Sequence, residues 1–186
     1  NVEFNAIGDP NAPIMIEEYS DFQCSYCRIF FMNTEKSLVD SYVEDGAVYF
    51  VYKSFGAFNS VESGRAAEAA YCAGDQGKFW EMHDTIFVNQ TGVNVGAYSD
   101  RRLIAFAETI NLDADEFRSC FNSEKYKERV EQDSKDGILA GVSATPSFVL
   151  TYVVDGETKT RLIEGAQPIS VFQQEIDSIL AEIGQQ

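Results

Sequence analysis

Sequence patterns typical of β-strands occur only towards the two ends of this chain, and a long helical stretch separates them. Short runs rich in β-branched and aromatic residues, which favour strands, lie at 13–19, 47–52, 147–154 and 157–163. A helical pattern from Cys24 to about Asp40 connects the first two runs. A strand, a covering helix and a second strand in this order predict parallel pairing, because the helix carries the chain back across the sheet.

The last two predicted strands form a hairpin. Asp155-Gly156 lies between the runs 147–154 and 157–163, and Asp-Gly in that position is a strong signal for a two-residue turn. Apolar residues then recur at steps of three and four, which predicts an amphipathic helix from Pro168 to Ile183. Parallel and antiparallel strands together predict an α/β fold, with a small mixed sheet and helices on both faces.

Between residues 60 and 136 the composition changes to alanine and charged residues, which favour helix. We expect helices near 60–74, 77–89, 99–110, 113–121 and 123–137. The chain would then comprise a first part of the sheet domain at 1–58, an all-helical insertion at 59–139 and a second part at 140–186. The length of 186 residues suits one domain that carries such an insertion.

The protein is strongly acidic, with 30 Asp and Glu against 14 Lys and Arg and a formal net charge of −16. This charge repels phosphate backbones and anionic membranes, which argues against nucleic-acid binding. No run of 18 apolar residues is present, so we expect no transmembrane helix. The chain starts at Asn1 and not at Met, which indicates a processed or trimmed product, and the preceding segment could have been a signal peptide or an anchor.

Two of the four cysteines are close together, in Cys24-Ser25-Tyr26-Cys27, where the first predicted strand leads into the first helix. Thiols three residues apart on a first helical turn lie within reach of a disulfide. At the helix N-terminus, free N–H groups and the helix dipole lower the pKa of a thiol. We expect Cys24 to be the exposed nucleophile and Cys27 the resolving thiol. Half of a metal site, or an inert disulfide, is the alternative.

The other two cysteines, Cys72 and Cys120, do not form a second close pair, and His83 is the only histidine. A structural zinc site would need all four cysteines, or three of them and His83, without the usual paired spacing. We therefore expect no metal site, and we expect His83 to pack against or cap a helix of the insertion.

A second motif, GVSATPSF at 141–148, places Thr145-Pro146 at the start of the predicted hairpin. Together with the Cys24–Cys27 pair, it resembles the thioredoxin superfamily. The helical insertion makes the chain similar to the DsbA-like proteins of that superfamily, the disulfide-forming oxidases of the bacterial envelope. Other stretches similar to DsbA-like proteins are GDPNAP at 8–13, YSDFQC at 19–24 and GKFWEMHD at 77–84, so the likeness extends over nearly the whole chain.

The resemblance implies a thioredoxin fold with a helical insertion and a cis Thr145–Pro146 bond that faces the dithiol. The Thr145 backbone would then be free to pair with an extended substrate strand beside Cys24. Together with Pro146, Ser25 and Tyr26, Thr145 makes up the substrate-binding residues that we expect.

Two further residues match positions of the superfamily. Glu18, six residues before Cys24, matches a buried acid beneath the dithiol, and Lys53 matches its basic partner. The carboxylate would relay protons to and from Cys27, and Lys53 would hold it ionised. Glu17, on the opposite strand face, is the internal control. The alternative for Glu18 and Lys53 is a salt bridge at the sheet edge.

Some DsbA-like proteins carry a second cysteine pair in the insertion. The resemblance therefore implies a structural disulfide between Cys72 and Cys120, which would suit an oxidising compartment. Two buried free thiols are the alternative.

The function that the resemblance implies is thiol–disulfide exchange, most of all the oxidation of unfolded or reduced proteins in the periplasm or cell envelope. It requires no metal or organic cofactor, and we expect a monomer that a separate membrane or quinone-linked redox partner reoxidises. DsbA itself has Pro-His between its cysteines, whereas Ser25-Tyr26 offers no cation, so the strongly oxidising potential does not simply carry over. A disulfide reductase or isomerase is one alternative. A copper carrier or a peptide-binding chaperone is an alternative from another class.

Overall fold

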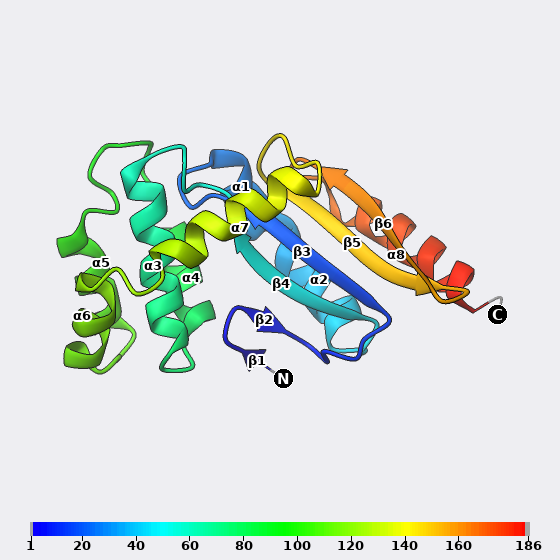
Figure 1. Ribbon diagram of the computed structural model, residues 1–186, viewed down its shortest axis with the longest axis horizontal. Coiled ribbons are helices and arrows are strands. Elements are labelled where there is room, and N and C mark those ends of the chain that lie inside the picture. Colours follow the sequence, from blue (N-terminus) through cyan, green and yellow to red (C-terminus); the bar gives the residue numbers. More distant parts are fainter. Residues whose placement is uncertain (1, 185–186) are drawn as a thin grey trace.

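The computed structural model describes residues 2–184, and its centre is a six-stranded mixed sheet with the order β1-β2-β4-β3-β5-β6 (Figure 1). The strands are β1 (Val2–Glu3), β2 (Ala6–Ile7), β3 (Ile14–Ser20), β4 (Val48–Ser54), β5 (Ser147–Val154) and β6 (Glu157–Glu164). β3 and β4 pair in parallel, and the other neighbouring strands pair antiparallel. The mixed sheet predicted from the sequence is confirmed.

The helices are α1 (Ser25–Phe30), α2 (Lys36–Leu38), α3 (Val61–Gly74), α4 (Phe79–Val88), α5 (Asp100–Thr109), α6 (Ala114–Asn122), α7 (Lys127–Leu139) and α8 (Ile169–Ile183). π-helical turns at Phe31–Glu35 and Val39–Val43 join α1 and α2 into one helical segment, residues 25–43. The sequence predicted this segment as one regular helix and did not indicate the π-helical turns. No helix within residues 2–184 combines the length and the apolar character of a membrane span.

The N-terminal strands β1 and β2 were not predicted. Each has two residues, which is too short for an alternating pattern to be visible in the sequence. Ala6 pairs with Val51 and Ile7 with Phe50, so β2 extends the sheet beyond β4. β2 therefore forms because β4 gives it a pairing partner, and not because its own two residues favour a strand.

β3 presents alternate side chains to the two faces of the sheet. Its register with β4 sets Ile16 opposite Phe50 and Glu18 opposite Tyr52, so these side chains share one face. α2 and α8 lie over that face, and α7 crosses the other (Figure 1). Helices therefore cover both faces, and the two acids Glu17 and Glu18 point in opposite directions.

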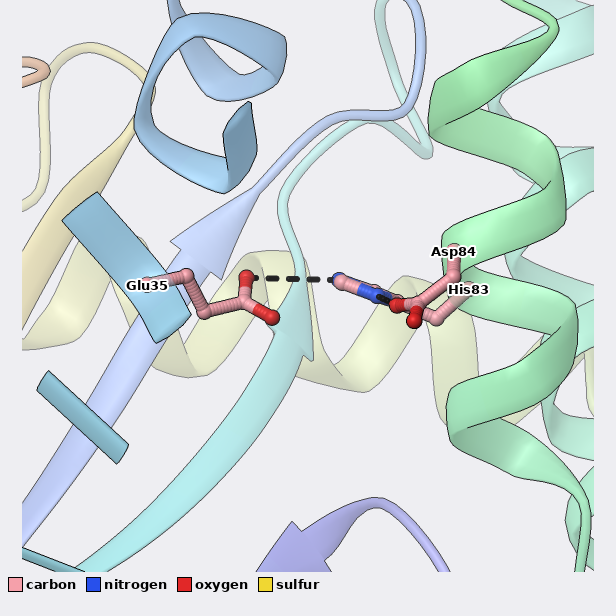
Figure 2. A group of neighbouring side chains, drawn as sticks. All are labelled: Glu35, His83 and Asp84. Atoms are coloured by element: carbon pink, nitrogen blue, oxygen red, sulfur yellow. Dashed lines mark hydrogen bonds and ion pairs between the residues drawn. The ribbon is translucent and has the colours of Figure 1, made fainter. Parts of the chain in front are cut away.

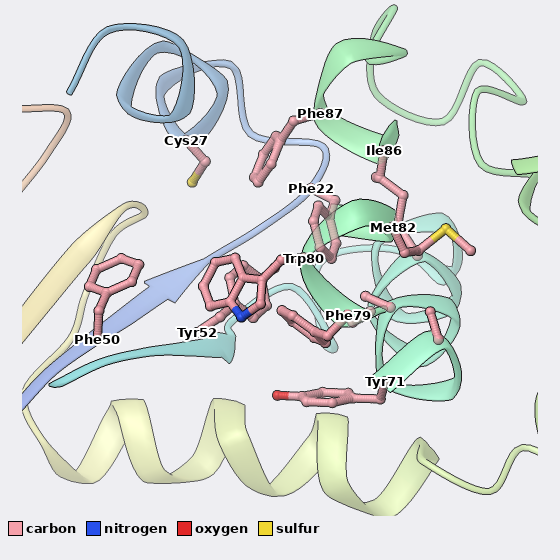
Figure 3. Close-up of a cluster of buried hydrophobic side chains, with 14 of the residues drawn as sticks. Phe22, Cys27, Phe50, Tyr52, Tyr71, Phe79, Trp80, Met82, Ile86 and Phe87 are labelled. Carbon is pink, nitrogen blue, oxygen red and sulfur yellow. The ribbon is translucent and has the colours of Figure 1, made fainter. Parts of the chain in front are cut away.

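One buried aromatic core joins the sheet to the helical insertion (Figure 3). The ring centroids of Phe22 and Phe87 are 4.9 Å apart, and those of Phe22 and Tyr52 are 5.1 Å apart. Cys27 points into the same core and has no exposed surface. The insertion thus supplies part of the wall around Cys27.

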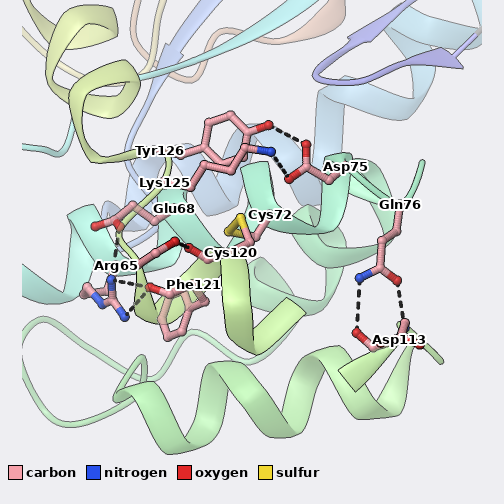
Figure 4. Close-up of a disulfide and its surroundings, with 11 residues drawn as sticks. Arg65, Glu68, Cys72, Asp75, Gln76, Asp113, Cys120, Phe121, Lys125 and Tyr126 are labelled. Carbon is pink, nitrogen blue, oxygen red and sulfur yellow. Dashed lines mark hydrogen bonds and ion pairs between the residues drawn. A yellow bond between two sulfur atoms is a disulfide. The ribbon is translucent and has the colours of Figure 1, made fainter. Parts of the chain in front are cut away.

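A disulfide between Cys72 of α3 and Cys120 of α6 holds the insertion together (Figure 4). Beside it, the Arg65 guanidinium donates to the Phe121 carbonyl oxygen at 3.3 Å, and Lys125 forms an ion pair with Asp75 at 2.7 Å. The pair that the resemblance implied is therefore bonded in the structure.

Replacing Cys72 and Cys120 together by alanine should lower the free energy of unfolding by about 4 kcal/mol, because the bridge closes a long loop in the unfolded chain. Denaturant titration of both proteins measures this difference, and a difference near zero would contradict it. The reactivity of Cys24 towards an alkylating reagent should stay unchanged, since the bridge lies in the insertion.

Candidate functional site

The two thiols of the Cys24–Cys27 pair occupy different environments at the start of α1. Cys24 is the N-cap residue and is partly exposed, whereas Cys27 lies inside the first turn and is fully buried. The backbone N–H of Asp21 donates to the Cys27 sulfur at 3.4 Å. Both cysteines are free in the structure, which therefore represents the reduced pair.

The two thiols differ strongly in pKa. A hydrogen bond from the Cys27 thiol, helped by the Thr145 side chain and by the N–H groups of Cys27 and Tyr26, lowers the pKa of Cys24 to about 6 against partial burial. Burial raises the pKa of Cys27 well above its usual value. Cys24 is therefore the nucleophilic thiolate, and Cys27 retains its proton.

Thr145 and Pro146 lie beside the dithiol although they are far away in the sequence. Their peptide bond is cis, and the Cys24 sulfur lies 3.4 Å from the Thr145 carbonyl oxygen, to which it donates when it is protonated. Pro146 is buried, and its own carbonyl accepts from the Gly165 N–H at 2.8 Å. Ser25 and Tyr26 are exposed next to Cys24, and Tyr26 has 62% of its surface accessible. These four predicted substrate residues therefore surround the nucleophile.

Glu18 is a fully buried acid on the strand that leads into the dithiol. Within the described part of the chain, neither of its carboxylate oxygens has a hydrogen-bond partner of ordinary length. Burial raises the pKa of Glu18 to about 8, and the nearby Ser20 side chain opposes this rise. Glu18 is therefore mostly neutral at pH 7.

The predicted partnership of Glu18 with Lys53 is wrong. The Lys53 ammonium lies 3.7 Å from Glu17 and 3.5 Å from Asp133. In the parallel register Lys53 is opposite Tyr19, whereas Glu18 is opposite Tyr52, so the two side chains lie on opposite faces of the sheet. Lys53 therefore does not hold Glu18 ionised, and the salt-bridge alternative applies to Lys53 with Glu17.

Sequence reasoning missed Ser20, Gln90 and Tyr98. Ser20 is fully buried, and its side chain lowers the pKa of both Glu18 and Cys27, which places it near both. Gln90 and Tyr98 donate to the Phe22 carbonyl at 2.6 and 3.1 Å, and Gln90 also donates to the Cys24 carbonyl at 3.0 Å. These contacts join the insertion to the loop before α1, and no sequence motif indicated them.

Glu35, His83 and Asp84 are a group of metal-binding residue types among residues 2–184 (Figure 2). His83 Nδ1 lies 2.9 Å from Asp84, and His83 Nε2 lies 3.9 Å from Glu35. The two carboxylates thus approach different nitrogens of one ring, whereas an ion binds a single nitrogen. The arrangement does not fit a metal centre, and His83, expected to pack or cap, is a buried link between two acids.

Comparison with known proteins gives one family and several relatives. Residues 1–164 match the family model described as Thioredoxin. The "Na(+)/H(+) antiporter NhaA 1" of Salinispora arenicola is 32% identical over 142 residues, which are 76% of this chain and 20% of the relative. The "Probable disulfide bond formation protein D" of Bacillus anthracis is 27% identical over 146 residues, which are 76% of this chain and 67% of the relative.

The fold is also similar to solved structures. The crystal structure of Wolbachia pipientis alpha-DsbA1 matches with a TM-score of 0.83 and 22% identity, covering 96% of this chain and 92% of that one. This match establishes likeness of fold. The present chain spans about a fifth of the length of the antiporter relative.

Replacing Glu18 by glutamine should make stability less dependent on pH. In the wild type, the unfolded chain ionises Glu18 above about pH 4.5 while the folded protein keeps it neutral up to about pH 8, so stability falls over this range. The stability of Glu18→Gln relative to the wild type should therefore rise by about 3 kcal/mol between pH 4.5 and pH 7.

Denaturant titrations across this pH range test the prediction. Glu17→Gln is the matched control, and its change with pH should be smaller because Lys53 lowers the pKa of Glu17 against burial. A difference between Glu18→Gln and the wild type that stays constant with pH would show that Glu18 ionises normally in the folded protein.

Proposed function

The chain belongs to the thioredoxin family, and we propose that it is a thiol–disulfide oxidoreductase that introduces disulfides into proteins through Cys24 and Cys27. The observation that carries the proposal is the pairing of a partly exposed Cys24 of low pKa with a buried Cys27 of high pKa. A pKa of about 6 gives roughly ten thiolates for each thiol at pH 7. Such a thiolate is a good leaving group, which favours the reduced protein and hence oxidation of the substrate.

The exchange starts from the Cys24–Cys27 disulfide. A substrate thiolate attacks the Cys24 sulfur, and the bond to Cys27 breaks, so that Cys27 takes the electron pair and then a proton. A second substrate thiolate attacks the substrate sulfur of the mixed disulfide, and Cys24 leaves as a thiolate. The substrate gives up two electrons and two protons, of which one proton stays on Cys27 and the other goes to solvent.

In this cycle we assign to Glu18 the transfer of a proton to and from Cys27. A carboxyl group with a pKa of about 8 is mostly protonated at pH 7, so it can protonate the Cys27 thiolate as it leaves. In the reduced protein Glu18 is protonated again, so on reoxidation it must first release its own proton before its carboxylate takes the proton of Cys27. Ser20 lies on the same face of β3 as Glu18, and its hydroxyl has no hydrogen-bond partner of ordinary length among the described residues. This hydroxyl, which lowers the pKa of both Glu18 and Cys27, is therefore suited to pass the proton between them.

The substrate would be an unfolded or reduced protein segment in an extended conformation. The Thr145 backbone beside Cys24 and the exposed Ser25 and Tyr26 support this binding mode. The name of the Bacillus anthracis relative refers to disulfide bond formation, which supports the oxidising direction. The bonded Cys72–Cys120 pair favours a place outside the cytoplasm, where a separate redox partner would reoxidise a monomeric protein.

The reduction potential of the Cys24–Cys27 pair, titrated in glutathione buffers, decides the direction. We expect a value closer to the roughly −120 mV of DsbA than to the roughly −270 mV of thioredoxin, because Cys24 is a stabilised thiolate. Mass spectrometry of Cys72 and Cys120 in the same samples keeps the two cysteine pairs apart. A reduction potential near that of thioredoxin would show that the protein is a reductase and not an oxidase. The proposed thiol–disulfide exchange itself would still hold.

Single cysteine variants test the roles of the two thiols. Cys24→Ser should abolish oxidation of a reduced substrate protein, whereas Cys27→Ser should accumulate the mixed disulfide with Cys24, detectable by mass. The doubly substituted Cys72→Ala and Cys120→Ala protein is the control that keeps activity. Full function in Cys24→Ser would instead support a peptide-binding chaperone, and stoichiometric copper in the reduced wild type would support a metal carrier.

A further inference from the structure

Glu18 is buried, yet the proposed cycle requires it to exchange a proton with solvent. In the described structure its side chain has no exposed surface, and burial opposes its ionisation. Cys27 is equally enclosed by the aromatic core. A second group must therefore connect Glu18 with water.

Glu35 is a second largely buried acid, and it lines an open cavity. It stands in the helical segment 25–43 and is largely buried, and its Oε2 lacks a hydrogen-bond partner among the residues described. Glu18 is opposite Phe148 in the sheet register, and the Phe148 ring lies 4.5 Å from that of Phe30 in the same helical segment, so Glu18 faces the segment that carries Glu35. The charge of Glu18 accordingly adds to the burial that raises the pKa of Glu35. Glu35 also lines a cavity of about 460 Å³ at the surface, together with Trp80 and Asp84. Glu35 thus belongs to the segment that Glu18 faces and also reaches this cavity.

His83 is held against Glu35 by Asp84 (Figure 2). The Asp84 carboxylate, which is 57% exposed, lies 2.9 Å from Nδ1, so we assign the ring proton to Nδ1. The lone pair of Nε2 then faces Glu35 Oε2 at 3.9 Å. Aromatic rings enclose the rest of the imidazole, and the titratable groups that face it are Glu35, Asp84 and Tyr52.

We propose that Glu35 carries protons between Glu18 and solvent and that His83, oriented by Asp84, is its proton-transfer partner. The inference rests on the proposed function, because the path is needed only if Cys27 gains and loses a proton. During reoxidation Glu35 first gives its proton to Nε2 of His83, while the Nδ1 proton passes to Asp84 and water. The Glu35 carboxylate then takes the proton of Glu18, and the Glu18 carboxylate takes that of Cys27. During substrate oxidation each transfer runs in reverse and restores the Nδ1 tautomer, so the protons balance over one cycle.

The gap between Glu35 and His83 requires a small movement. A direct hydrogen bond needs about 1 Å less than the 3.9 Å separation, which a rotation of the Glu35 side chain can supply. Glu35 lines the cavity, so its side chain is not packed on every side. The transfer therefore needs no rearrangement of the backbone.

The test follows the step in which Cys27 loses its proton. The mixed disulfide between Cys24 and glutathione is formed on the intact protein, and its resolution by Cys27 is timed from about pH 5 to about pH 9. Glu35→Gln should slow resolution about tenfold at pH 7 and recover at high pH, where hydroxide accepts the proton. The thiolate absorbance titration of Cys24 should not change, because hydrogen bonds from Cys27, Thr145 and Tyr26 are what lower the pKa of Cys24.

Two further variants make the test specific. His83→Gln should slow resolution less, by about threefold, and the double variant should be no slower than Glu35→Gln alone, because both residues belong to one path. Glu17→Gln, on the other face of the sheet, is the control and should retain the wild-type pH profile. If Glu35→Gln does not fold, Asp84→Asn decides instead, since Asp84 is exposed and its amide cannot accept the proton; it should slow resolution as His83→Gln does.

A wild-type pH profile in Glu35→Gln, or in Asp84→Asn where that variant decides, would overturn the proton path. If the slowing caused by Glu35→Gln and that caused by His83→Gln multiply in the double variant, the two residues act independently, and the shared path is overturned. Failure of the wild type itself to resolve the mixed disulfide would overturn the proposed function and is distinguishable, because it requires no variant.

Discussion

The hydrogen bond between the Cys27 thiol and the Cys24 sulfur is the interaction on which the site depends. It is the largest influence that lowers the pKa of Cys24, and it exists because Cys27 retains its proton. Cys27 retains the proton because it is buried. The acidity of the exposed thiol is therefore produced by the burial of its partner, and not by a neighbouring cation. Ser25 and Tyr26 contain no cation, so this route explains how the pair is activated without one.

The burial of Cys27 comes from parts of the chain that are far apart in the sequence. Phe22 precedes the dithiol, whereas Phe87 belongs to the insertion, and their rings pack at an inclined angle near Cys27. Gln90 and Tyr98 then fix the loop before α1 through its carbonyl groups. The insertion is thus part of the active-site wall and not an appendage to the sheet. The Cys72–Cys120 disulfide, which holds α3 to α6, therefore stabilises the same insertion that forms part of the wall around the reactive pair.

The features that depend on short sequence distances could be predicted. The Cys24–Cys27 spacing, the hairpin around Asp155-Gly156 and most helices follow from local patterns, and the structure contains them. Glu18 was found through a resemblance, but its partner was not, because pairing with Lys53 depends on the register between β3 and β4. Glu35 and Ser20 gave no signal at all. Their importance comes from the residues that surround them in the fold. In the sequence, an acid in a predicted helix is most simply interpreted as a solvent-exposed residue.

Strand alternation explains the electrostatics of the whole site. Glu17 and Glu18 are chemically identical neighbours, but one faces Lys53 and the other faces Tyr52 and the core. Glu17 therefore has a cation that offsets its burial, while Glu18 has none and stays protonated near neutral pH. A proton donor for a buried thiolate must be neutral before the reaction and able to ionise during it. Placing the lysine on the opposite face is what keeps Glu18 in that state, so the absence of the predicted ion pair favours proton donation to Cys27.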